Sequence, residues 1–361
     1  MVNYMAKFME SKFPQRGLPT AMYHLTWSLA HWDLSRKNVR FEGMEEIVKL
    51  NAPFILIKPH WSAIDYAIEM SMLTIPKSLE NHEFSEKSIV NDTHFRNVAR
   101  KMGSDEVRKP VSFWIKTNWY EPVPVLGSIP NWGLGKYLKS VGQIPVSSTR
   151  HIIEKDFLKR TGRKLRKETY DAIRAGYKSR ERIDMSSLSN KSRLAIMDLL
   201  DNRGIDFDDF IEYCDFIDDC REECMRLTMD ASRRMIKYGG NLGIYVTGTR
   251  AKKGKLQNIA FMGGAQALMQ LSGEFPNIVA VVMASDHILR LGKDKGANIE
   301  TKLVDIVPAS RYHIQRCRPF SREDRGRNGD VYREITKGFM EKMNDELSEE
   351  RKMEGELTIA A

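Results

Sequence analysis

The sequence has no run of about 18 consecutive apolar residues, so no segment predicts a transmembrane helix. Charged residues interrupt the first 17 positions (Lys7, Glu10, Lys12 and Arg16), and we therefore expect no secretory signal there. Only 4 cysteines are present and none of them forms a CxxC pair. This cysteine usage fits a protein of a reducing compartment rather than a disulfide-bonded one.

Several motifs that carry known chemistry are also missing. No G-x-S-x-G stretch occurs, and this excludes the nucleophile elbow of many hydrolases. Residues 248–256 are similar to a phosphate-binding loop, but Leu256 stands where that loop needs Ser or Thr. Residues 198–209 weakly echo a calcium loop, but Arg203 replaces the glycine of its sharp turn. We therefore expect neither a metal ion nor a resident cofactor.

What the sequence does have is an excess of positive charge. Its 57 Lys and Arg residues outnumber its 48 Asp and Glu residues, which gives a formal net charge of +9. Such a charge suits an anionic partner, which includes nucleic acid, an acidic membrane face and phosphorylated small molecules, or it serves solubility alone. The 361 residues suffice to bury a substantial core, in one large domain or two small ones.

Short apolar runs alternate with helical patterns along the chain. The predicted strands span residues 39–42, 54–57, 112–116, 142–147, 242–246 and 278–284, with a short helix between the first two. Strands that alternate with helices build parallel sheets covered on both sides. The sequence therefore predicts an α/β fold with a mostly parallel mixed sheet flanked by helices and a charged, helical insertion.

Four regions divide the predicted chain. Residues 1–37 form an N-terminal helical region whose helix, Leu18–Ser35, is mostly apolar and carries two tryptophans. This composition suits an anchor at a membrane surface, although packing on the protein core explains it equally well. Residues 38–320 form the main domain, interrupted by the insertion 151–224, and residues 321–361 form a charged C-terminal helix and tail.

Basic and acidic residues occupy different parts of the predicted insertion. Residues 155–182 are densely basic, whereas residues 198–223 are acidic. One interpretation is that these are two solvated helices that pair with each other. The other is that the basic helix meets phosphates, on a membrane or on nucleic acid.

His60 follows a predicted strand at a position where a catalytic residue is expected. The apolar run Phe54–Ile57 predicts a buried strand that delivers His60 to the carboxyl edge of the sheet, where open α/β sheets bind ligands. If Ser62 caps a following helix, Asp65 lies in its first turn and can reach back to the imidazole. A carboxylate that orients a histidine supports a general base. The alternative is a buried histidine with a structural role.

The His60–Asp65 segment is the first of four short sequence motifs. The other three follow it along the chain in this order: the Gly142–Val146 segment, the Gly248-Thr249-Arg250 triplet and the apolar strand Ile278–Val282. In this order the chain resembles the glycerolipid acyltransferase family, which includes lysophosphatidate and glycerol-3-phosphate acyltransferases. The resemblance covers roughly residues 38–320 outside the insertion.

The resemblance implies roles for seven residues. His60 and Asp65 match the catalytic pair of the family. The residues that would hold the phosphate of the acceptor are Gly248, Thr249, Arg250, Lys116 and Arg150. An arginine after a strand can offer a fork of donors to phosphate, or it can pair with a carboxylate for structural reasons.

The chain also departs from the family pattern. Thr247 stands where the third block usually has glutamate before its glycine. Ser147 and Ser148 stand where the second block usually ends in Asp-Arg, and Arg150 follows two residues later. Both differences fall on the part of the pattern that recognises the acceptor.

Taken with the resemblance, the sequence predicts an O-acyltransferase. The acyl group would move from an acyl-CoA or acyl-carrier-protein thioester, used as a co-substrate, to a hydroxyl of a phosphate-bearing glycerolipid or its precursor. We expect a cytoplasmic protein that works at the inner membrane face. A scaffold of the same fold that binds anionic lipid without turnover is the alternative. Nucleic acid is not an expected partner, because the basic stretch lacks interleaved aromatic residues.

Overall fold

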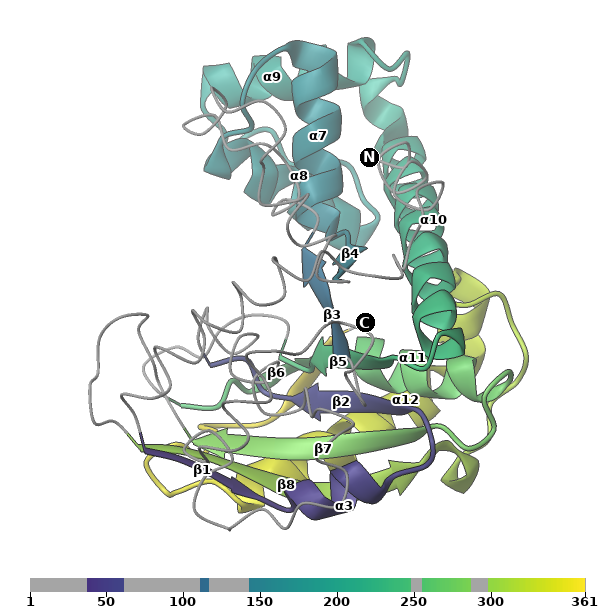
Figure 1. Cartoon of the computed structure of the whole chain (residues 1–361). Helices are drawn as coiled ribbons and strands as arrows, with labels where there is room; N and C mark the ends of the chain where they lie inside the picture. The colour runs from purple at the N-terminus through teal and green to yellow at the C-terminus, as the bar shows by residue number, and fades with distance from the viewer. Residues whose placement is uncertain (1–37, 62–110, 117–142, 248–254, 287–297, 361) are drawn as a thin grey trace, which may run out of the picture. The chain divides into compact units, whose positions relative to one another are not determined.

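The computed structural model describes residues 38–61, 111–116, 143–247, 255–286 and 298–360 (Figure 1). The chain divides into two compact units. One contains residues 145–228, and the other contains residues 38–61, 111–114 and the described residues after 228. The predicted N-terminal helix lies outside the described residues, and the predicted domain boundaries stay a prediction. No helix in the described part of the chain is both long and apolar enough to span a bilayer.

A seven-stranded sheet carries the candidate site. Its strands are β1 (Asn38–Glu42), β2 (Phe54–Lys58), β3 (Val111–Lys116), β4 (Ile144–Val146), β5 (Asn241–Tyr245), β7 (Val279–Asp286) and β8 (Asn298–Pro308). Their order in the sheet is β1-β8-β7-β2-β5-β3-β4. All six strands that the sequence predicts are present in it. The predicted α/β class with a mostly parallel mixed sheet is therefore confirmed.

Strand β2 lies inside this sheet and pairs in parallel with two neighbours. It runs beside β5 on one edge and beside β7 on the other (Figure 1). All five of its residues are buried. A parallel strand that is covered on both faces needs apolar side chains at consecutive positions rather than at alternate ones. This requirement explains why a continuous apolar run predicts the strand.

Strand β8 is the element of this sheet that sequence patterns do not predict. It carries the charged residues Glu300, Lys302 and Asp305 at exposed or half-buried positions. It pairs antiparallel to β7 and parallel to β1, which makes the sheet mixed. Because the solvent-facing positions of such a strand are polar, no apolar run marks it.

Two helices pack on the sheet. Helix α11 (Gly263–Ser272) contacts β2 and β5, and helix α12 (Arg322–Asp345) contacts β7 and β8. A methyl group added to Gly264 of α11 would lie only 2.8 Å from Cδ1 of Ile57 in β2. The missing side chain thus lets α11 approach the strand that leads to His60.

The C-terminal segment differs from its predicted form. Residues 321–361 are predicted as a charged helix and tail, and helix α12 begins at Arg322, within that range. Its start is set by Ser321, whose Oγ accepts a hydrogen bond of 3.0 Å from the N–H of Asp324. The tail ends in strand β9 (Thr358–Ala360), which pairs in parallel with β6 (Ile259–Phe261). A strand of three residues is too short to show a periodic pattern.

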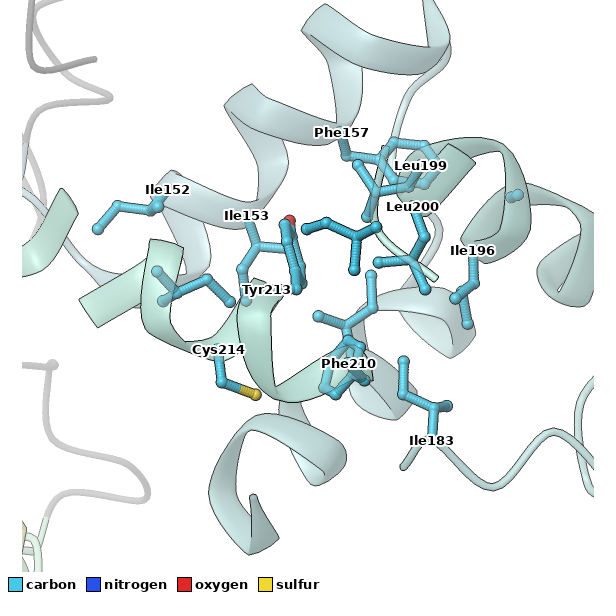
Figure 2. Packing of buried hydrophobic residues seen from close by; sticks show 14 residues of the cluster. Ile152, Ile153, Phe157, Ile183, Ile196, Leu199, Leu200, Phe210, Tyr213 and Cys214 are labelled. Atoms are coloured by element: carbon cyan, nitrogen blue, oxygen red, sulfur yellow. The ribbon is translucent and has the colours of Figure 1, made fainter. Parts of the chain in front are cut away.

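The predicted insertion is helical, as expected, but it is more than two solvated helices. Its helices are α7 (Thr149–Thr161), α8 (Lys167–Ser179), α9 (Asn190–Asp201) and the first part of α10 (Phe210–Lys237), with a short 3-10 turn (Phe207–Asp209) before α10. Figure 2 shows buried side chains from these helices packed against one another, among them Ile153, Phe157, Leu199 and Tyr213. The insertion therefore has a hydrophobic core of its own.

The basic and acidic stretches of this helical unit pair with each other. Arg163 lies 2.9 Å from a carboxylate oxygen of Asp198, and Arg182 lies 2.8 Å from Asp208. The interpretation in which the two stretches pair is confirmed for these residues. Pairs of this kind are largely solvated and contribute about 0–1 kcal/mol each, so the core rather than the charges stabilises the unit.

Glu168 of helix α8 gives this unit a dependence on pH. Its carboxylate accepts hydrogen bonds from the N–H and O–H of Ser189, the residue that caps α9, and from the O–H of Ser192. These bonds lower the pKa of Glu168 from 4.5 to about 2. The ionised carboxylate therefore stabilises the folded state above pH 4.5, and this contribution is lost as the pH falls toward 2.

We therefore expect Glu168→Gln to lower the free energy of unfolding at neutral pH and to make little difference near pH 2. Urea unfolding followed by circular dichroism at a series of pH values measures this difference. A difference between the two proteins that stays constant across the acid range would contradict the assignment.

Candidate active site

His60 lies just beyond the carboxyl end of β2. Lys58, the last residue of β2, pairs with Tyr245 of β5, and the N–H of Val246 donates to the carbonyl of Lys58 at 3.0 Å. The two chains therefore stay side by side as they leave the sheet, and Thr247 comes level with His60. This is the edge at which the sequence places the histidine, and it is where parallel sheets bind their ligands.

Thr247 holds the backbone of His60. The N–H of His60 donates a hydrogen bond of 3.2 Å to Oγ1 of Thr247. Thr247 is buried, with only 1% of its surface exposed. A hydroxyl in a place sheltered from water makes a hydrogen bond whose loss is costly. Thr247 thus takes part in positioning the backbone of His60.

The imidazole of His60 stacks on the ring of Tyr245. The ring centroids are 4.3 Å apart and the planes differ by 22°. His60 itself is half-buried, so part of its surface remains accessible to a substrate. In a stacked arrangement the two ring nitrogens lie in the plane of the imidazole, where their hydrogen bonds are not blocked by the neighbouring ring.

Sequence reasoning missed the buried residues next to His60 in the chain and the ring that packs against Tyr245. Lys58 is fully buried, and Trp61 is 3% exposed. Phe113 of β3 is also fully buried, and its N–H donates to Oε1 of Gln143 at 2.7 Å. A lysine at the end of an apolar run was a usable signal for Lys58, because a lysine is rarely buried without a specific role. No signal in the sequence joins Phe113 or Tyr245 to His60.

The structure describes only some of the predicted site residues. Asp65, Gly248, Thr249 and Arg250 lie outside the described residues. Lys116 is the last residue of β3, a strand that pairs in parallel with β5. The structure therefore brings His60 beside Thr247, and the roles of the other predicted residues stay predictions.

Arg150 lies in helix α7 of the helical unit. Its Nε donates to Oε1 of Glu154 at 2.7 Å, and its guanidinium lies over the ring of Tyr170 at 5.0 Å from the centroid. The hydrogen bond to Glu154 raises the pKa of Arg150. About 63% of the side chain is exposed, so this surface pair can open at little cost. Its predicted role as a phosphate ligand stays a prediction.

Within the described part of the chain, no three His, Cys, Asp or Glu side chains gather as a metal site requires. The contacts of His60 in the structure are the hydroxyl of Thr247, which bonds to its backbone N–H, and the ring of Tyr245, which stacks on its imidazole. Such a group can accept a proton from a hydroxyl that is bound within hydrogen-bond distance.

We expect Thr247→Val to lower the free energy of unfolding by about 1–3 kcal/mol, because it leaves the hydrogen bond from the His60 N–H unmade in a buried place. Thr247→Ser keeps the hydroxyl and is expected to lose less than half as much. Urea unfolding of the three proteins compares them. Equal losses for the valine and serine variants would show that the methyl group, and not the hydrogen bond, matters.

The strand order and helical cover define the class of this protein as α/β with a mostly parallel mixed sheet. No protein-family model matches the chain, and no curated protein matches it. Among solved structures, the chain is similar to the 1-acyl-sn-glycerophosphate (LPA) acyltransferase PlsC from Thermotoga maritima. The identity is 12%, the match covers 94% of this chain and 88% of that chain, and the TM-score is 0.35. Because this TM-score is low, the fold class of the protein is assigned from its own strand pairing and not from this similarity.

Proposed function

We propose that the protein is an O-acyltransferase. It moves a fatty acyl group from a thioester to a hydroxyl of a phosphate-bearing glycerolipid or its precursor. The observation that carries this proposal is the position of His60 just beyond the carboxyl end of the central strand β2. There Thr247, two residues after β5, holds its backbone, and Tyr245 of β5 stacks on its ring. The ordered blocks of the sequence support the same reaction.

In the proposed reaction His60 acts as a general base. Its imidazole takes the proton from the acceptor hydroxyl while the hydroxyl oxygen attacks the carbonyl carbon of the thioester. The carbon–sulfur bond then breaks, the ester forms, and the leaving thiolate takes up a proton from the imidazolium. Asp65 would orient the imidazole and stabilise its protonated form. The acyl group passes directly to the acceptor, with no covalent acyl-enzyme.

The acceptor would be held by its phosphate. Gly248, Thr249 and Arg250 follow β5 in the sequence, directly after the residue that bonds to His60. Arginine binds phosphate through two parallel hydrogen bonds, and backbone amides of a turn add neutral donors. Lys116 and Arg150 are further candidates. The net charge of +9 would attract both anionic substrates.

The acyl donor would be acyl-CoA or an acyl-carrier protein, and no other cofactor is needed for this chemistry. The acceptors are amphipathic or are precursors of membrane lipids, so we place the reaction at the inner face of the cytoplasmic membrane. The predicted helix Leu18–Ser35 would serve as the surface anchor.

The test is acyl transfer by the purified full chain. A radiolabelled acyl group is supplied as the CoA thioester or on the carrier protein, with glycerol 3-phosphate, lysophosphatidate or an uncharged lysolipid as acceptor. Mass spectrometry identifies the product. We expect an ester of a phosphate-bearing acceptor. Thioester that stays intact with every acceptor would overturn the proposal.

A second function is favoured by one observation. Thr247 stands where the family has glutamate, and its hydroxyl is bonded to the backbone of His60. A site altered in this way could bind anionic lipid without turning it over. Flotation with vesicles of anionic lipid, combined with an assay for released thiol, separates the two functions. Vesicle binding without thiol release would favour the scaffold.

A further inference from the structure

We propose that Tyr245 is the positioning residue of His60, as the middle member of a column of three stacked rings. This inference rests on the proposed role of His60 as a base. The ring of Tyr245 lies between that of His60, at 4.3 Å, and that of Phe113, at 5.3 Å, both measured between centroids. Each pair of rings departs from parallel by 22°. Phe113 lies in β3, Tyr245 is the last residue of β5, and His60 follows β2 by two residues.

A glycine provides the space in which this column forms. Gly243 of β5 pairs with Phe113 of β3, and it precedes Tyr245 by two residues, so the two positions share one face of the sheet. A methyl group added to Gly243 would lie 2.3 Å from Cε1 of Phe113. The ring of Phe113 therefore covers the backbone of Gly243, and any larger residue there would push the ring away.

The far end of the column is fixed by burial. Phe113 is completely buried, and its N–H donates to the side chain of Gln143, which is also completely buried. An aromatic ring in such a place has few alternative rotamers, because the surrounding atoms are close-packed. Tyr245 in turn packs against this fixed ring, and His60 packs against Tyr245. The fixed ring of Phe113 thus restricts the ring of Tyr245, which in turn restricts the half-buried imidazole of His60.

A stacked imidazole is restricted in a way that matters for proton transfer. Tilting the imidazole out of its plane beside the Tyr245 ring would break the contact, so the stack limits His60 to orientations in that plane. Productive proton transfer needs the base within hydrogen-bond reach of the hydroxyl and aligned with it. The face of Tyr245 also favours the imidazolium that forms when His60 takes the proton.

The experiment compares variants that keep or remove the ring. Tyr245→Phe retains the stacked ring, whereas Tyr245→Leu and Tyr245→Met remove it at similar volume. We expect kcat to fall about tenfold in the Leu and Met variants, with KM for the thioester unchanged, and to stay within about twofold in the Phe variant. Tyr238→Leu, at a residue that is 57% exposed, is the matched control and is expected to leave kcat unchanged.

A second readout reports the stack without using activity. The ring protons of His60 lie over Tyr245 and are expected to resonate upfield in the proton NMR spectrum. The chain has 8 histidines, and His60→Gln identifies the signal by removing it. Tyr245→Leu and Tyr245→Met should move this signal downfield, and Tyr245→Phe should not.

The two readouts keep this inference apart from the proposed function. An absence of acyl transfer in the unmodified protein defeats the acyltransferase proposal, whatever the NMR signal shows. An unshifted His60 signal in the Leu and Met variants overturns the ring column. A shifted signal with unchanged kcat overturns the positioning role.

Discussion

Replacing His60 with alanine is expected to lower kcat for acyl transfer by about 10²–10⁴-fold, the usual contribution of a positioned general base. The substitution removes the group that takes the proton from the acceptor hydroxyl. The preceding strand β2 ends at Lys58 and does not include the substituted residue. KM for the thioester should change little, since the imidazole acts on the acceptor and mainly in the transition state.

Steady-state kinetics with the radiolabelled thioester measure this change. The matched control is His313→Ala, at an exposed histidine, which is expected to leave kcat unchanged. Thermal unfolding of both variants shows whether the protein remains folded. Undiminished turnover in a folded His60→Ala protein would rule out the proposed base.

The second large effect is expected in the helical unit. Asp156 of α7 accepts hydrogen bonds from Nε of Arg203 at 2.7 Å, from Nη2 of the same guanidinium, and from the hydroxyl of Tyr213 at 3.2 Å. The side chain of Asp156 is 7% exposed and that of Arg203 is 11% exposed. The guanidinium also lies 3.4 Å from the centroid of the Phe216 ring. The pair therefore connects α7 and α10 through the end of α9.

We expect Asp156→Ala to lower the free energy of unfolding by about 3–5 kcal/mol, because it leaves the guanidinium of Arg203 buried without its carboxylate. The matched control is Asp171→Ala, which breaks the exposed pair between Asp171 and Lys167. That pair is worth about 0.3–0.5 kcal/mol. Urea unfolding followed by circular dichroism compares the two. Similar losses in both variants would mean that the buried pair contributes no more than a surface pair.

The sequence predicted the sheet well where strands are buried on both faces. Strands such as β2 and β7 are continuous apolar runs, and their length and composition suffice to identify them. Strand β8 was missed because its charged residues face solvent, and β9 was missed because three residues carry no pattern. Helix α12 begins at Arg322, within the range 321–361 that the sequence predicts for a charged helix and tail, and Ser321 caps it.

The helical insertion was likewise predicted in one respect and missed in another. Its charges predicted helices that pair with each other, and pairs such as Arg163–Asp198 confirm this. Its hydrophobic core was not predicted, because its members are scattered over four helices and each helix also carries many charges (Figure 2). The moderate number of apolar residues in each helix becomes a core only when the helices are brought together.

The position of His60 after β2 was predicted from the sequence, and the contacts around it were not. A buried strand followed by a histidine located His60, because the end of such a strand is fixed by local patterns. Thr247 was noticed as a departure from the family, whereas its hydrogen bond to the His60 backbone depends on the pairing of β2 with β5. Tyr245 and Phe113 were not singled out, since nothing local connects them to His60.

By itself, therefore, the sequence determined where most of the sheet strands form and which histidine follows the central strand, because those features depend on neighbouring residues in the chain. Only the tertiary structure decided what holds that histidine. Residues 60, 113, 243 and 245 meet because parallel pairing brings distant strands into one register. The contacts that result depend on distances of a few ångströms between segments far apart in the sequence, and no local pattern encodes them.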